Sequence, residues 1–131
     1  QIKIDCDVIQ ADGGTRTAAI TGAWVALRIA CEHLLLAGAI TQSPLTGQIA
    51  AISCGIYQKQ AILDLDYKED SSAEIDANFI LTAAGEIVEV QATGEENPFS
   101  RSSLNEMLDL AESGCGQLFA LQKQAVQDSN L

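Results

Sequence analysis

The feature that most constrains this fold is a series of four strand-like segments separated by short turns. They cover residues 48–57, 60–67, 73–82 and 86–93. Gly55 interrupts the first segment, where it indicates a bulge or the close approach of another group. The letters "AAGE" between the last two segments predict a tight turn. We therefore expect these residues to form strands of a sheet.

A long helix is predicted before the first of these segments, from Thr17 to about Ala37. Apolar residues recur there at steps of three and four and form one stripe: Ile20, Trp24, Leu27, Cys31 and Leu34. Few polar residues interrupt the pattern, which is typical of a helix sandwiched between other elements rather than lying on the surface.

Helical periodicity returns after residue 100. Ser103 and Glu106 have the spacing of a capping box, which predicts a helix start near 101–103. Gly114 and Gly116 predict its end, and a last helix is expected over residues 117–127. At the other end of the chain, residues 2–8 alternate apolar and polar side chains, which predicts a half-buried strand. The expected order is strand, long helix, four strands and two helices, in an α/β domain of the two-layer kind.

Length and charge limit the classes of function. The chain has 131 residues, about one domain, and a net charge of −11. Such a charge, taken alone, argues against a nucleic-acid partner. The longest apolar run carries Arg28, Glu32 and His33, which argues against a membrane span. The four cysteines lack any C-x-x-C spacing, so we expect reduced, mostly buried thiols in a cytoplasmic protein.

The letters "ADGGTRTAAITGA", residues 11–23, place two glycines directly before the long helix. A helix start leaves backbone N–H groups unpaired and carries partial positive charge, which suits an anion. Gly13 and Gly14 allow a ligand to approach the backbone, Thr15 offers a hydroxyl and Arg16 a guanidinium fork. Neither a Walker A motif nor a dinucleotide fingerprint is present. The alternative is an ordinary glycine turn before a helix.

The letters "YKEDSSAEIDANF" form a second candidate site. In a strand, Glu74, Asp76 and Asn78 share one face, and Asp70 can fold back towards them. Mg²⁺ favours one or two carboxylates together with waters and phosphate oxygens; the alternatives are a carboxylate pair for acid–base work or a solvated acidic strand face. The single histidine, His33, lies within the long helix, so a Ser–His–Asp hydrolase is not indicated.

Three motifs appear in order and together resemble the ribonuclease PH family. They are "DCDVIQADGGTRTAAITGA", "LDLDYKEDSSAEIDANFILT" and "EIVEVQATGEENPFS", and the resemblance covers essentially the whole chain. The catalytic ring subunit of the archaeal exosome and polynucleotide phosphorylase look similar but more distant. The resemblance implies a bacterial phosphorolytic exoribonuclease that trims transfer-RNA 3′ ends, uses inorganic phosphate and Mg²⁺, and releases nucleoside 5′-diphosphates.

The resemblance also assigns roles to individual residues. Gly14, Thr15 and Arg16 would hold the attacking phosphate, and Asp70 and Asp76 would be the catalytic, metal-associated carboxylates. Asn78 stands where polynucleotide phosphorylase has a lysine, so no role is carried over to it. Glu74 is considered a helper only.

Members of the family are about twice as long as this chain, which resembles their C-terminal half. We therefore expect residues 1–131 to be the C-terminal portion of a single ribonuclease PH-like domain. The missing half would supply another phosphate-binding arginine and much of the basic RNA-binding surface, and the whole would form a hexameric ring. Two other functions remain possible: a non-catalytic, RNA-binding ring subunit of exosome type, and a small anion-binding module unrelated to RNA.

Overall fold

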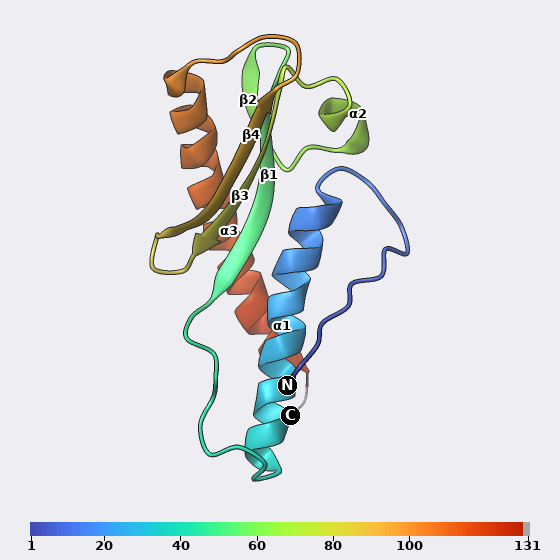
Figure 1. Ribbon diagram of the computed structural model, residues 1–131, viewed down its shortest axis with the longest axis vertical. Helices are drawn as coiled ribbons and strands as arrows, with labels where there is room; N and C mark the ends of the chain where they lie inside the picture. Colours follow the sequence, from blue (N-terminus) through green and yellow to red (C-terminus); the bar gives the residue numbers. More distant parts are fainter. Residues whose placement is uncertain (130–131) are drawn as a thin grey trace.

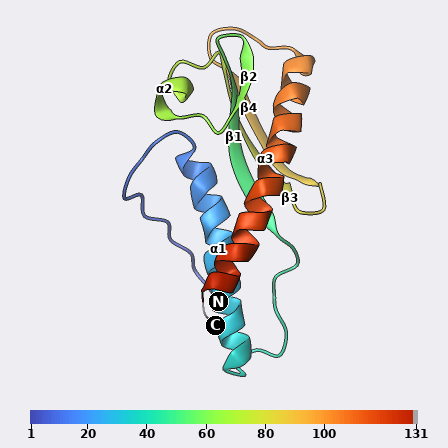
Figure 2. The ribbon, with the colours of Figure 1, turned by 180° about the vertical axis from the view of Figure 1, so that it is seen from behind.

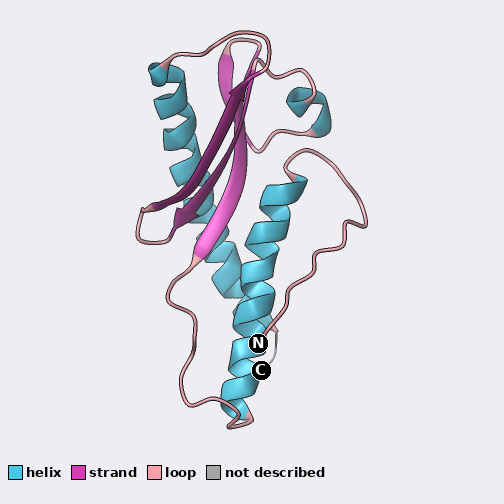
Figure 3. Cartoon of the chain, in the orientation of Figure 1, coloured by secondary structure: helices cyan, strands magenta, loops and turns pink. Residues whose placement is uncertain are grey.

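The computed structural model describes residues 1–129, which form three helices and one sheet (Figures 1 and 3). The four strands of the sheet are antiparallel and lie in the order β2-β1-β3-β4. The predicted α/β class is confirmed. In chain order the elements are α1 (Thr15–Leu36), β1 (Ile49–Tyr57), β2 (Gln60–Leu63), α2 (Tyr67–Asp70), β3 (Ile75–Thr82), β4 (Ile87–Gly94) and α3 (Arg101–Asp128).

The hydrophobic core lies between α3 and one face of the sheet, and α3 crosses in front of the strands in the view of Figure 2. Alternate residues of β1 and β3 point into it, including Ile52, Cys54, Ala77 and Phe79. Burial raises the pKa of Cys54 to about 12 and that of Cys115 to about 11. Both therefore remain neutral thiols that pack in the core, as expected for buried, reduced cysteines.

α3 is one continuous helix, so the prediction that Gly114 and Gly116 separate two helices is wrong. Gly114 faces the sheet, and a Cβ atom there would lie 2.6 Å from the Ile52 side chain. This glycine lets helix and sheet pack closely rather than ending the helix. The helix begins at Arg101, within the predicted range of 101–103, but its N-cap is Ser100 and not Ser103. The Ser100 hydroxyl accepts a hydrogen bond from Ser103 N at 3.1 Å.

α1 begins on the opposite face of the sheet and continues along the part of β1 that β2 does not cover. There the Thr21 hydroxyl donates to Ala51 O at 3.0 Å and accepts from Ala51 N at 2.9 Å. Gln122 of α3 donates to Thr21 O and to Ile49 O. Side chains from both helices thus satisfy backbone groups that a neighbouring strand would otherwise pair.

The prediction that α1 is sandwiched between other elements is wrong for the described residues. Only Thr17 and Cys31 of this helix are buried. By length and composition alone α1 could span a membrane. Its contacts with β1, and the bond from Trp24 Nε1 to Gly47 O at 3.0 Å, instead place it as a helix packed on the sheet.

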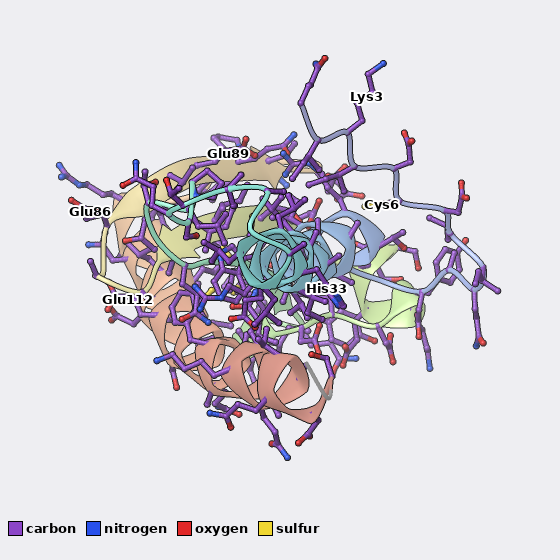
Figure 4. The ribbon with its side chains drawn as sticks, turned by 90° about the horizontal axis from the view of Figure 1, so that it is seen from below. Lys3, Cys6, His33, Glu86, Glu89 and Glu112 are labelled. Carbon is purple, nitrogen blue, oxygen red and sulfur yellow. The ribbon has the colours of Figure 1, made fainter. Side chains whose placement is uncertain are left out.

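Residues 2–8 do not form the predicted strand; they run in an extended, exposed path beside α1 (Figure 1). Figure 4 shows Lys3 and Cys6 on this path, away from the body of the sheet. The alternating pattern is present in the sequence, but a strand requires a paired neighbour. Residues 1–8 pair with neither β2 nor β4, the two edge strands of the described chain.

The strand predicted over residues 60–67 is shorter than expected. β2 ends at Leu63, and residues 67–70 form the single-turn helix α2. The Asp66 carboxylate accepts from Glu69 N, and the Glu69 carboxylate accepts from Asp66 N, so this turn has a complete capping box.

Candidate functional site

The glycine junction forms the start of α1, as the sequence predicts. Gly14 is the N-cap and adopts the left-handed conformation, with φ at +68°. Within residues 1–129, no side chain caps this helix start, because the N-cap residue is a glycine; the Thr15 hydroxyl donates to Asp12 O at 2.8 Å. The first N–H groups of α1 therefore remain available to a ligand.

Asp12 links this junction to α2. Its Oδ1 atom accepts from Gly13 N at 2.8 Å and from Tyr67 N at 2.7 Å, and these two bonds lower the pKa of the Asp12 carboxyl. Gly13 packs so closely that a Cβ atom would lie 2.0 Å from Leu65 O. The junction is therefore fixed against the segment that leads to Asp70. An Asx residue before two glycines is a turn signal that could have identified Asp12 from the sequence.

Asp70 and Asp76 line one open cleft of about 860 Å³ at an end of the sheet. Asp70 ends α2, and Asp76 is the second residue of β3. The other acidic residues of this cleft are Glu74, Glu95, Glu96 and Glu106, and Lys59 also lines it. The structure thus brings together the two carboxylates that sequence analysis assigned to the metal.

The pKa of Asp76 is raised, first by burial and then by the charges of Asp70 and Glu95. A bound cation would offset both effects, because it favours the charged form of each carboxylate. Among residues 1–129, no three histidine, cysteine or acidic side chains gather closely enough to hold an ion by themselves. Two carboxylates completed by water and phosphate oxygens are a donor set that suits Mg²⁺.

Glu74 lies one residue before β3, and its carboxylate accepts from Lys59 N at 3.0 Å. This bond directs Glu74 to the turn between β1 and β2. Asn78 lies on the same face of β3 as Asp76 and pairs with Ser53 of β1. Glu95 was missed by sequence analysis, because it follows β4 and comes near Asp76 only through the pairing of β3 with β4.

The strand register relates the two candidate sites. On β1, Ser53 and Gly55 point to one face and pair with Asn78 and Asp76 on β3. Gly14 lies against Ser53 on that face, since a Cβ atom on Gly14 would be 3.1 Å from Ser53 Oγ. The glycine junction therefore adjoins the row of the sheet next to Asp76. In the described chain, residues 14–16 do not themselves line the acidic cleft.

Arg16 reaches across this face to β4, where its Nη2 atom lies 2.8 Å from Glu89 Oε1. Both side chains are more than two-fifths exposed, so the pair is accessible to solvent and weak. A phosphate at the junction would compete with Glu89 for the guanidinium group.

The comparison with protein families matches residues 47–114 to the "3′ exoribonuclease family, domain 2". This span is just over half of the chain, and the chain therefore belongs to that family. Within it, the chain is similar to Ribonuclease PH of Caulobacter vibrioides, with 58% identity over 126 residues, and to Ribonuclease PH of Roseobacter denitrificans, with 55% identity over 125 residues. These matches cover 96% and 95% of this chain but 53% of each relative, so the chain spans about half the length of the curated relatives it matches.

Among solved structures, the crystal structure of rice (Oryza sativa) Rrp46 matches with a TM-score of 0.71 and 18% identity. The match covers 91% of this chain and 51% of the rice chain. At this identity the likeness is one of fold, and it confirms the ribonuclease PH-like architecture expected from the sequence.

Proposed function

We propose that the protein carrying this chain is a phosphate-dependent 3′→5′ exoribonuclease that shortens transfer-RNA 3′ ends. Family membership and the similarity to Ribonuclease PH support the exoribonuclease class. The observation that carries the phosphate dependence is the Asp12 link, which fixes an uncapped helix start beside the segment that bears Asp70.

In this proposal, the N–H groups at Gly14 and Thr15 and the guanidinium group of Arg16 hold inorganic phosphate. One oxygen of that phosphate bonds to the phosphorus of the last phosphodiester while the bond to the preceding 3′ oxygen breaks. The 3′ oxygen takes up a proton, and the terminal nucleotide leaves as a nucleoside 5′-diphosphate. The chain's contribution is mainly positioning and charge stabilisation.

Asp70 and Asp76 are the residues that would hold Mg²⁺. When bound, Mg²⁺ neutralises developing charge on phosphate oxygens and on the leaving oxygen. The acidic cleft is suited to a cation but not to RNA without one, because its carboxylates would repel a phosphodiester backbone.

The net charge of −11 requires that most of the RNA-binding surface comes from elsewhere. We propose that this chain is the C-terminal portion of a ribonuclease PH-like domain, and that the other portion supplies this basic surface. We also propose a hexameric ring of such domains and a cytoplasmic location.

The test uses the full protein, a transfer RNA with a 3′ extension, and the Arg16→Ala variant. Loss of a charge-assisted contact predicts a rise of about 10- to 100-fold in the KM for phosphate. Arg28→Ala is the control, because Arg28 pairs with Glu32 within α1 and lies outside the proposed site. Equal phosphate KM values for both variants would contradict the proposal, and a folded parent that binds RNA without releasing nucleotide would favour a non-catalytic ring subunit.

A further inference from the structure

Ser53 is a buried polar residue in the central part of the sheet. Its exposed fraction is 4%, and its Oγ atom has no hydrogen-bond partner among the described residues. Buried hydroxyls are nearly always hydrogen-bonded, so such an exception requires a physical explanation. Sequence analysis did not identify Ser53, because nothing in the letters "AAISCGI" distinguishes it from a residue that only packs.

The hydroxyl lies directly under the glycine junction. A Cβ atom added to Gly14 would lie 3.1 Å from Ser53 Oγ and 3.2 Å from Thr17 Oγ1. Because Gly14 lacks a side chain, nothing beyond its α-carbon separates this hydroxyl from the start of α1. Glycine at this position thus serves the left-handed backbone and leaves space for the Ser53 hydroxyl beneath it.

The groups of the junction near Ser53 do not supply the missing acceptor. The Thr17 hydroxyl donates to Gly14 O at 2.8 Å and makes no hydrogen bond with Ser53 Oγ. The free backbone groups at the start of a helix are N–H donors, which cannot accept a bond from Ser53. Asn78 is the cross-strand partner on the same face and adds a polar side chain to the row. No described group accepts a hydrogen bond from Ser53 Oγ, and the free N–H groups beside it are donors, so an acceptor with several oxygens would suit the site.

We propose that the Ser53 hydroxyl is a binding group of the anion site at the start of α1 and donates a hydrogen bond to inorganic phosphate. The inference rests on the proposed function of the glycine junction and extends it with a residue from the sheet below. Phosphate at the uncapped N–H groups would give the hydroxyl its acceptor, reached by rotation of the serine side chain between its rotamers. Ser53 binds the phosphate and takes no part in proton transfer.

The experiment measures inorganic phosphate binding to the full protein by calorimetry, and thermal unfolding with and without phosphate at constant ionic strength. Ser53→Ala is expected to weaken phosphate binding about fivefold to tenfold and to reduce the thermal shift that phosphate causes. Without phosphate, its Tm should equal or exceed that of the parent, because an unsatisfied buried hydroxyl is removed. The control is Ser113→Ala, an exposed serine of α3, which should change neither quantity.

The outcomes separate this inference from the proposed function. If Arg16→Ala weakens phosphate binding and Ser53→Ala does not, the Ser53 role is wrong while the phosphate site stands. If the parent itself does not bind phosphate, both are wrong. A lower Tm of Ser53→Ala without phosphate would show that the hydroxyl has a structural partner. Weaker RNA binding with unchanged phosphate affinity would assign it to the nucleic acid. Either of these last two results overturns the inference.

Discussion

At the residue scale, the acidic cleft depends on carboxylates that disfavour one another's charge. Asp76 is half-buried and lies near Asp70 and Glu95, and all three effects raise its pKa. A raised pKa in the folded state means that this carboxyl stabilises the fold when protonated and loses that contribution as the pH rises through its folded pKa. The charges of the cleft thus favour a bound cation and do not stabilise the fold.

The Asp70→Asn variant is expected to lower the pKa of Asp76, since one repelling charge is removed. The measurement is a carboxyl titration followed by NMR, without divalent ions. Glu106→Gln is the matched control, because Glu106 lines the same cleft and is not among the causes of the Asp76 shift. An Asp76 pKa that is equal in the two variants would show that Asp70 does not act on Asp76.

Glu89 forms an ion pair with Arg16 and would compete with a phosphate for its guanidinium group. Its replacement by glutamine is expected to strengthen phosphate binding severalfold, about fivefold at most, because an exposed ion pair contributes roughly 1 kcal/mol or less. Glu86→Gln is the control, because it changes the net charge equally and leaves the ion pair between Arg16 and Glu89 intact; Figure 4 labels both glutamates. If the two variants gain equally in a phosphate titration, general charge and not the pair with Arg16 is responsible.

At the scale of elements, the strands and the long first helix follow directly from sequence periodicity, whereas two features depend on tertiary contacts. In the sequence, Gly114 predicts the end of a helix, yet it lies inside α3. Its close packing against Ile52 arises only when the helix and the sheet assemble, so the sequence pattern does not show it. Residues 2–8 alternate like a strand but have no strand beside them. A sequence pattern shows which side chains are apolar, but not which helix or strand covers them.

The two glycines of α3 should respond oppositely to alanine. Gly116→Ala is expected to raise the free energy of unfolding by up to about 1 kcal/mol, since a Cβ atom there meets open space. Gly114→Ala should lower it, because overpacking against Ile52 and Leu63 costs about 1–3 kcal/mol and exceeds the gain in helix propensity. Chemical denaturation measures both. Equal stabilisation by the two variants would contradict the close contact of α3 with the sheet.

Thr21 joins α1 to the uncovered part of β1. Thr21→Val removes the partner of Ala51 N and O, which are buried, and is expected to cost about 1–3 kcal/mol. Thr41→Val, at an exposed residue outside the helices, is the control and should stay within roughly 0.5 kcal/mol of the parent. A Thr21→Val variant as stable as the control would mean that α1 does not depend on these two bonds.

At the scale of the whole molecule, the candidate site is assembled from segments far apart in the chain. Gly14 to Arg16 could be proposed from the sequence, since their residue types suit an anion, and the resemblance to the ribonuclease PH family singled out Asp70 and Asp76. Ser53, Glu89 and Glu95 could not, because only the register of β1, β3 and β4 places them beside these groups. In the proposed function, the start of α1 would hold the anion and Asp70 and Asp76 would hold the cation, on adjoining parts of one sheet, an arrangement that suits phosphorolysis.

The most direct test of this account is the chemical identity of the nucleotide that the full protein releases from a transfer RNA labelled at its 3′ end. The account predicts a nucleoside 5′-diphosphate, formed only when inorganic phosphate and Mg²⁺ are both present. Release of a nucleoside 5′-monophosphate without phosphate would identify water as the attacking group and would contradict the phosphate role assigned to the start of α1.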